Sequence, residues 1–286
     1  MTILYWLLAF LLHQNLVNVI SLRVIRTSYP LSGTLISMVA RSKSGELLLE
    51  TPSTIDIMMK DVATGILNLQ RSNSTGTRIG FVDIPLPVTG GTELDDWPGG
   101  IQQKFSVLSA LLKDGGTFKA LNFSTSVVNK SNFMSEAEDG IGIWEDKGIV
   151  LTTFVTPEQV DEIVDRSEKM NNQELFVLIN NQFFLDPLSR DISKNLLKNG
   201  ENAYTLEQLN MRGYDGVLPV RGVLFRCYPD KFQVGRRLDE GGYVLIRQFE
   251  YKPSREELEM VFKEDSTVRD KNLSFQQRLQ KMIPQF

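Results

Sequence analysis

The sequence is poor in the two side chains that most often carry catalysis and metal binding. Among 286 residues it has one histidine, His13, and one cysteine, Cys227. A single cysteine excludes an intrachain disulfide and a cysteine-rich zinc site. If the segment around His13 is cleaved, the working protein has no imidazole. That would exclude a Ser-His-Asp or Cys-His triad, a histidine metal site and a histidine pH switch.

The N-terminal apolar block is too short to cross a bilayer. Residues 3–12 are ten consecutive apolar residues, whereas a membrane-spanning helix needs about twenty. The block matches the core of a secretory signal peptide, with a cleavage site at Val19-Ile20-Ser21. We therefore expect residues 1–21 to be a signal peptide and the mature form to have no integral membrane span. A signal anchor holding a lumenal domain is the alternative.

Acidic residues are missing from the stretch that follows. Residues 22–45 contain four basic and seven hydroxyl residues but no Asp or Glu. Basic, hydroxyl-rich and acid-free composition is typical of a transit peptide. A signal peptide followed by a transit-like segment is the arrangement used by algae whose plastid lies inside extra membranes. We expect a plastid location, and a secreted protein with a basic linker is the alternative.

The rest of the chain is acidic. Residues 46–286 carry 27 basic and 35 acidic residues, a net charge of −8, against −4 for the whole sequence. Nucleic-acid binding relies on clustered Lys and Arg to neutralise phosphates. We therefore expect no nucleic-acid partner.

Hydrophobic spacing predicts alternating helices and strands, then mostly strands. The expected helices cover residues 55–69 after a Thr51-Pro52 cap, 101–113, a segment after Thr156-Pro157, 186–200, 255–263 after a Ser254 cap, and 273–283. The expected strands cover residues 78–84, 119–123, 149–154, 175–179, 204–209, 217–228 and 243–249. This order predicts an α/β fold: a single doubly wound, mostly parallel sheet flanked by helices, with an antiparallel C-terminal extension. We expect one domain at residues 46–265 and a C-terminal amphipathic helix at 266–286.

Three separated segments carry a family resemblance. They are Asp95–Gly100 (DDWPGG), Leu175–Phe184 (LFVLINNQFF) and Phe225–Val234 (FRCYPDKFQV). Together they resemble a domain-of-unknown-function family of cyanobacteria, plants and algae. That family occurs alone, at the C-terminus of plastid adenylate kinases, and in plastid proteins of the low-photosystem-II-accumulation type.

The resemblance covers about residues 50–263 and departs from the family pattern at two positions. Asn181 stands where the pattern has proline, and Phe232 stands where it has tryptophan. The family implies a plastid location and, for one branch, help in building photosystem II. It implies no catalytic residues.

The acidic Trp-Pro-Gly-Gly loop is the first candidate site. It follows an expected strand and precedes an expected helix, which is where ligands bind in parallel sheets. Gly99 and Gly100 would let backbone N–H groups approach an anion, and Trp97 would pack beside it. Asp95 and Asp96 could hold Mg²⁺ bridging to a phosphate. The alternative is a solvated turn in which Trp97 is a hydrophobic plug.

Three further residues complete the candidate set. Asp83, near the end of its strand, could join the acidic loop. Arg226 and Tyr228 are two residues apart on an expected strand and should face one side, where they could contact phosphate or a partner carboxylate. A polar strand end and a structural ion pair are the plainer interpretations. Cys227 is expected to be a buried, inert thiol.

The sequence thus predicts a non-catalytic plastid accessory protein that binds a protein partner, with photosystem or thylakoid assembly components as the expected class. One alternative is a Mg²⁺-dependent nucleotide- or phosphate-binding domain related to plastid adenylate metabolism. A second is a secreted glycoprotein, since four Asn-x-Ser/Thr sequons occur. No catalytic residue and no cofactor beyond Mg²⁺ with a phosphate ligand are expected.

Overall fold

Ten stretches of the chain are described by the computed structural model. They are residues 47–72, 79–86, 100–128, 132–133, 142–155, 159–171, 174–181, 200–211, 220–238 and 241–265. All of them belong to one structural unit, Val39–Phe286. The expected signal peptide, transit-like segment and C-terminal helix lie outside the described residues, and so does the expected helix at 186–200 apart from Gly200, which is in a strand.

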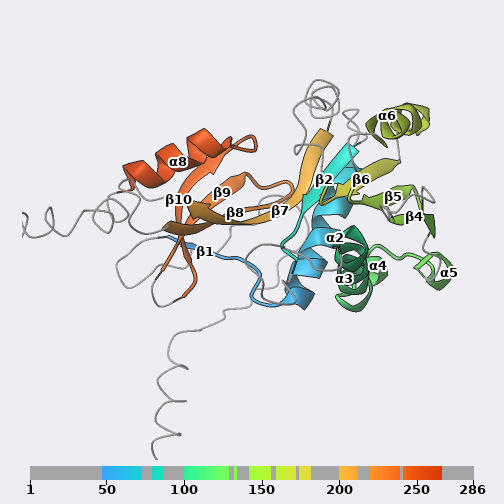
Figure 1. Ribbon diagram of the computed structural model, residues 1–286, viewed down its shortest axis with the longest axis horizontal. Coiled ribbons are helices and arrows are strands. Elements are labelled where there is room, and N and C mark those ends of the chain that lie inside the picture. Colours follow the sequence, from blue (N-terminus) through green and yellow to red (C-terminus); the bar gives the residue numbers. More distant parts are fainter. Residues whose placement is uncertain are drawn as a thin grey trace, which may run out of the picture. The chain divides into compact units, whose positions relative to one another are not determined.

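The described strands form one mixed sheet (Figure 1). Its order is β1-β10-β9-β8-β7-β2-β6-β5-β4-β3. The strands are β1 Leu48–Leu49, β2 Ile79–Asp83, β3 Asn132–Phe133, β4 Gly142–Asp146, β5 Ile149–Thr153, β6 Leu175–Ile179, β7 Gly200–Met211, β8 Val220–Cys227, β9 Phe232–Arg237 and β10 Tyr243–Phe249.

The prediction of a mostly parallel sheet is wrong. Only the three central pairings, β7–β2, β2–β6 and β6–β5, are parallel, and the six other pairings of described strands are antiparallel. One cause is the two-residue turn Lys147-Gly148, with φ of 52° and 75°. Positive φ at both positions is the geometry of a tight hairpin, which folds β4 back against β5. The predicted α/β class and the antiparallel run from β7 to β10 are confirmed.

A second error concerns residues 119–123, which were expected to form a strand. Residues Thr117–Ala120 form a short helix, α4, and a turn follows. Phe118 and Leu121 are three residues apart and both buried, which is helical spacing. A segment this short does not show enough repeats to separate a helix from a strand.

Helices lie on both faces of the sheet (Figure 1). α2 (Ile55–Ser72), α3 (Gly100–Asp114) and α4 pack on one face, in a core with Val82, Leu151 and Val177. α6 (Val160–Lys169) and α8 (Arg255–Glu264) pack on the other, in two separate clusters. α5 (Thr125–Val128) is one turn long. Alternate residues of each strand serve the two faces.

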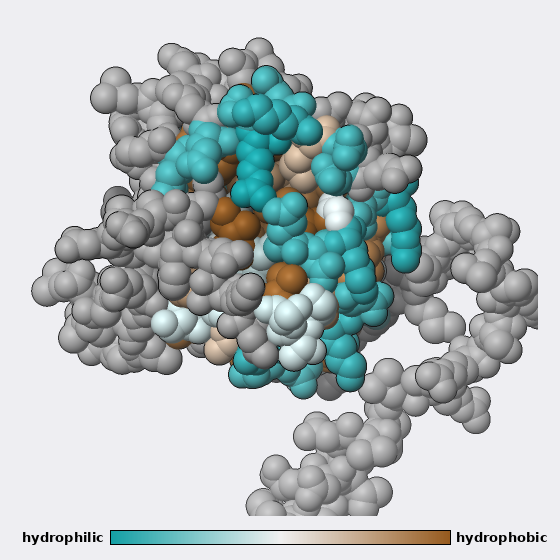
Figure 2. Space-filling model, turned by 90° about the vertical axis from the view of Figure 1, so that its right-hand side faces the viewer, coloured by the Kyte–Doolittle hydropathy of each residue, from teal (hydrophilic) through white to brown (hydrophobic). Residues whose placement is uncertain are grey.

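The exposed surface of α6 is polar, whereas α2 and α8 also expose the apolar side chains of Ile55, Ile57 and Met260. α6 buries Val160 and Ile163 and exposes charged residues on its outer side. Figure 2 shows that the described surface on this side of the molecule is mostly hydrophilic, with smaller apolar areas between the polar segments. No helix in the described part of the chain is both long and apolar enough to cross a membrane.

Two helix starts test the predicted caps. The Ser254 hydroxyl accepts a hydrogen bond from Glu257 N, and the Glu257 carboxylate accepts one from Ser254 N, so the predicted cap of α8 is confirmed. The prediction that Thr51-Pro52 caps α2 is wrong. α2 begins at Ile55, and the Thr54 hydroxyl accepts from Ile57 N at 3.2 Å. Thr54 is therefore the capping residue, three positions later than predicted.

Candidate functional site

A pocket of about 270 Å³ lies on the sheet face that carries α6 and α8. One lining residue, Phe81, belongs to the core beneath α6, and another, Phe232, belongs to the core beneath α8. The pocket is therefore placed between these two helical layers. Its lining residues are Phe81, Asp83, Asn181, Gly200, Glu201, Asn202, Arg226, Phe232, Glu250, Tyr251 and Lys252.

The floor of the pocket is a row of side chains across neighbouring strands. Asp83 on β2 is opposite Thr205 on β7, and Thr205 is opposite Arg226 on β8. Since Phe225 pairs with Gln233, Phe232 on β9 lies beside Arg226. Residues opposite one another point to the same face of a sheet. The fold thus brings together residues that are up to 149 positions apart in the sequence.

Arg226 is the most tightly held charge in the pocket. Its side chain is 7% exposed, and Nη1 donates to Glu201 Oε1 at 2.6 Å. Nε donates to the carbonyl oxygen of Asp230 at 2.8 Å. The guanidinium carbon lies 4.5 Å from the centre of the Phe232 ring and 5.5 Å from that of Tyr228. These contacts give the guanidinium and the Glu201 carboxylate fixed orientations.

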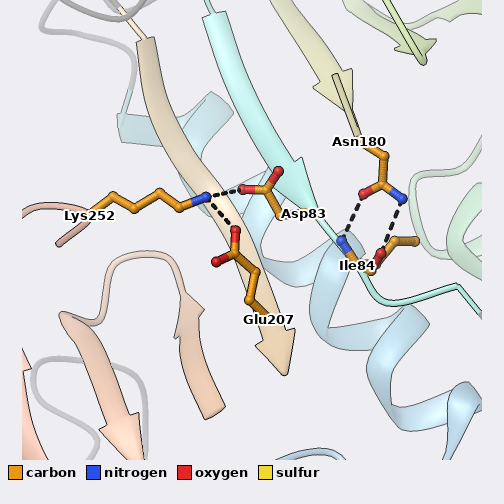
Figure 3. A network of polar contacts seen from close by, with 5 residues as sticks. All are labelled: Asp83, Ile84, Asn180, Glu207 and Lys252. Atoms are coloured by element: carbon orange, nitrogen blue, oxygen red, sulfur yellow. Dashed lines mark hydrogen bonds and ion pairs between the residues drawn. The ribbon is translucent and has the colours of Figure 1, made fainter. Parts of the chain in front are cut away.

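Lys252, another lining residue, joins β2 and β7 through its side chain (Figure 3). Its Nζ donates to Asp83 Oδ2 at 3.0 Å and to Glu207 Oε1 at 2.6 Å. Burial alone would lower the pKa of Lys252, but the two carboxylates outweigh burial and the pKa is raised. Lys252 therefore stays an ammonium at neutral pH and holds both carboxylates in place.

Two asparagines follow β6 at the edge of the pocket. Asn180 has a φ of 50°, and its side chain accepts from Ile84 N and donates to Ile84 O, which ties the end of β6 to the end of β2 (Figure 3). Asn181 lines the pocket, and its buried Oδ1 has no hydrogen-bond partner within the described residues. The hydroxyl of Thr205, fully buried under the pocket, lacks a partner there too. Buried polar atoms left in this state are costly, so Asn181 marks a place where a ligand group would be stabilised.

The structure brings some of the predicted site residues together. Asp83 and Arg226 line the same pocket, and Tyr228 contacts the Arg226 guanidinium. Gly100 is the first residue of α3. Asp95, Asp96, Trp97 and Gly99 lie outside the described residues, so the expected Mg²⁺ site stays a prediction. Elsewhere, within the described ranges, no three His, Cys, Asp or Glu side chains lie close enough to hold a metal ion.

Sequence reasoning missed four charged residues of the site: Glu201, Glu207, Glu250 and Lys252. A partial signal existed for Lys252, because it lies between the end of a predicted strand and the predicted Ser254 cap, where the chain must turn across the sheet. There was no such signal for Glu201 or Glu207. Asn181 and Phe232, the two departures from the family pattern, both line the pocket.

Cys227 lies on the opposite face from the pocket. Its thiol donates to the carbonyl oxygen of Asp61 on α2 at 3.4 Å, and burial, with Asp61 and Asp230, raises its pKa to about 12. A thiol with this pKa is almost entirely protonated at neutral pH and reacts slowly.

The comparisons with known proteins identify the family and little else. Residues 28–260 match the family described as "Domain of unknown function (DUF1995)". This chain belongs to the DUF1995 family. No curated protein and no solved structure matches the chain. The expected membership of a domain-of-unknown-function family is confirmed at this level, whereas the plastid and adenylate kinase associations stay predictions.

The pocket of this DUF1995 protein has the chemistry of a binding site. Its two cations are already paired with carboxylates, so their charges are largely neutralised from within. Asp83 and Glu201 each use one carboxylate oxygen in these pairs, and within the described residues the other oxygen has no partner. The pocket therefore offers oriented hydrogen-bond acceptors on an aromatic floor.

Proposed function

We propose that this protein is a non-catalytic accessory protein of the plastid that binds a protein partner during photosystem II assembly or maintenance. The location rests on the composition of residues 1–45, an apolar block followed by a basic, hydroxyl-rich and acid-free segment. The photosystem role rests on the resemblance to plastid proteins of the low-photosystem-II-accumulation type.

One observation carries the binding role: a pocket whose charged side chains are held by one another. Arg226, Glu201, Lys252 and Asp83 form two ion-paired groups across β2, β7 and β8 and the segment before α8. Side chains locked in this way lose little further conformational entropy when a ligand binds. Such preorganisation supports specific recognition, and the carboxylate oxygens left over supply its polar contacts.

The location is tested by fusing residues 1–45 to a fluorescent reporter in an alga with a plastid enclosed by extra membranes. We expect the reporter in the plastid. Fluorescence in the medium would replace the plastid proposal with secretion. As a control, the same fusion with Arg23, Arg26, Arg41 and Lys43 changed to Glu should no longer enter the plastid, because the positive charge of the transit-like segment is removed.

Partner binding is tested by capture from thylakoid extracts with the tagged protein. We expect photosystem II subunits or assembly factors to be recovered by the wild type and lost with Asp83→Asn, which removes a charge from the pocket. Glu145→Gln on β4, which breaks an exposed ion pair with Arg166 on α6, is the matched control. Recovery of no thylakoid protein contradicts the proposal. If calorimetry shows binding of Mg-ATP that disappears in Asp96→Ala, phosphate binding replaces partner binding as the proposed function.

A further inference from the structure

We propose that the pocket between α6 and α8 binds a primary ammonium group, presented as a lysine side chain of the protein partner. This inference rests on the proposed function, because it names the chemistry by which that partner is recognised. Four properties of the pocket lead to it: its charge, its unpartnered acceptors, its size and its aromatic floor.

The charge of the pocket favours a cation. Its lining contains the carboxylates of Asp83, Glu201 and Glu250 against the cations of Arg226 and Lys252. Lys231, outside the lining, pairs with Glu250 at 2.5 Å, so Glu250 adds no net charge. Glu207, which shares Lys252 with Asp83, adds another negative charge behind the lining. The excess is therefore negative even though every cation is paired. A phosphate or carboxylate ligand would be repelled, whereas an ammonium ion would be attracted.

The free acceptors match the donors of an ammonium group. An alkylammonium ion has three N–H donors and no acceptor. The pocket lining offers one unpartnered oxygen each on Asp83, Glu201 and Asn181, as judged within the described residues. Two of the three are carboxylate oxygens held by Lys252 and Arg226. Hydrogen bonds from a cation to fixed carboxylates are stronger than those between neutral groups.

Size and lining favour a single side chain. Pockets for drug-sized ligands measure about 300–1,000 Å³, and this one measures about 270 Å³. Tyr251, which is 58% exposed, supplies apolar surface for the methylene groups that precede an ammonium ion, and its ring attracts the cation itself. Phe81 and Phe232 are nearly fully buried beneath the pocket, and the Phe232 ring is already covered by the Arg226 guanidinium. A bare divalent metal fits less well, because among the described residues no three suitable ligands converge.

The ligand chemistry is tested by NMR titration of the full chain with three matched compounds. They are Nα-acetyl-lysine N-methylamide, its Nε-acetylated form, and the norleucine analogue, which keeps the methylene groups without the charge. We expect only the lysine compound to shift the resonances of pocket residues. Equal shifts with all three, or no shift with any, would overturn the proposal.

Substitutions of pocket residues test whether the lysine compound binds in the pocket. Asp83→Asn and Glu201→Gln should each weaken binding of the lysine compound about tenfold, as expected for loss of one charge-assisted hydrogen bond. Glu145→Gln, three strands from β2, should leave the affinity unchanged. Thermal unfolding of each variant checks folding, and Asp83→Asn still gives an answer if Glu201→Gln unfolds. Unchanged affinity in a folded Asp83→Asn protein would contradict the assignment.

A last pair of experiments separates this inference from the proposed function. Acetylating the lysines of the thylakoid extract should abolish partner capture. Capture that survives acetylation would overturn the lysine inference and leave the accessory function standing. In another outcome, the free diamine cadaverine would bind more tightly than a lysine peptide and no protein would be captured. That result would assign the pocket to a small amine and overturn the proposal of a protein partner.

Discussion

Thr205 and Thr117 are both fully buried threonines, but their hydroxyl groups have opposite surroundings. Thr117 Oγ1 donates to the carbonyl oxygen of Met59 at 3.0 Å, whereas Thr205 Oγ1 has no partner in the part of the chain that the structure describes. A buried hydroxyl without a partner costs free energy, and a methyl group of the same shape does not.

We therefore expect Thr205→Val to raise the free energy of unfolding by roughly 1–3 kcal/mol. Thr117→Val should lower it by about 1 kcal/mol, because it removes a satisfied hydrogen bond. Urea denaturation of the two variants and the wild type measures both changes. Destabilisation by both substitutions would mean that Thr205 has a partner after all.

A second test concerns how the contribution of Lys252 to the free energy of unfolding depends on pH. Replacing Lys252 with Met leaves the carboxylates of Asp83 and Glu207 unpaired, and we expect a loss of roughly 1 kcal/mol at pH 7, since the pair is partly exposed. The pKa of Lys252 is raised above its ordinary 10.5 in the folded protein. Its contribution is therefore complete below pH 10.5 and is lost as the pH rises through the folded value.

Unfolding of wild type and Lys252→Met at pH 7 and pH 11 checks this expectation. The difference in unfolding free energy between the two proteins should shrink at the higher pH. A difference that stays constant would show that the charge of Lys252 does not stabilise the fold.

The composition of the site was only partly predictable from the sequence. Asp83 could be singled out as an acid near the end of an expected strand, and Arg226 because it should share a strand face with Tyr228. Their meeting in one pocket depends on β7 pairing with β2 on one side and β8 on the other, which no local spacing encodes. That Glu201 and Lys252 belong to the site could be recognised only once this strand pairing was known.

Gly65 on α2 marks a close approach between a helix and the sheet. A Cβ atom at this position would lie 2.1 Å from the carbonyl oxygen of Ala203 on β7. A shift of strand register beside Ala203 puts both it and Tyr204 in the core with α2. The backbone of the helix therefore rests directly on the backbone of the strand.

We expect Gly65→Ala to destabilise the protein by about 1–3 kcal/mol through overpacking, although alanine favours helices by about 1 kcal/mol over glycine. Thr64→Ala, on the exposed side of the same turn, is the control and should change stability by less than about 0.5 kcal/mol. Thermal denaturation compares them. A stabilising Gly65→Ala would show that α2 can move away from β7 at little cost.

Helices and strands with several hydrophobic repeats were predictable from the sequence. α2 and α3 show the 3.6-residue spacing, and β6 is a run of apolar side chains, all five of which are buried. β9 and β4 were missed because their apolar residues are few and interrupted by glycine or charge. Their strand conformation depends on pairing with β8 and β5.

The overall topology could be predicted least. β2 lies at the centre of the sheet although it is an early strand in the sequence, and it is flanked by β6 and β7, about a hundred residues later. Parallel pairing at long range leaves no signature in a single segment. An alternation of helices and strands predicts a doubly wound parallel sheet. In this protein, parallel pairing is limited to the three central strand pairings.

Because the sheet is continuous, both of its halves should unfold together. Leu224 on β8 is fully buried in the cluster under α8. We expect Leu224→Ala to lower the unfolding free energy by about 2–5 kcal/mol. Hydrogen exchange should show the same loss for the amides of β5 and β6 as for those of β8 and β9. A smaller loss in β5 and β6 would instead indicate two separate cooperative units.

The lengths of the outermost strands bear on self-association. Strands β1 and β3, which end the described sheet, contain two residues each. An edge strand presents unpaired N–H and C=O groups that can recruit a strand from another molecule, and very short edge strands limit that recruitment. β1 and β3 themselves therefore offer little template for edge-to-edge aggregation when the protein is concentrated. Each pairs with only two residues of its neighbour, so within the described residues any such recruitment would use the remaining edges of β10 and β4.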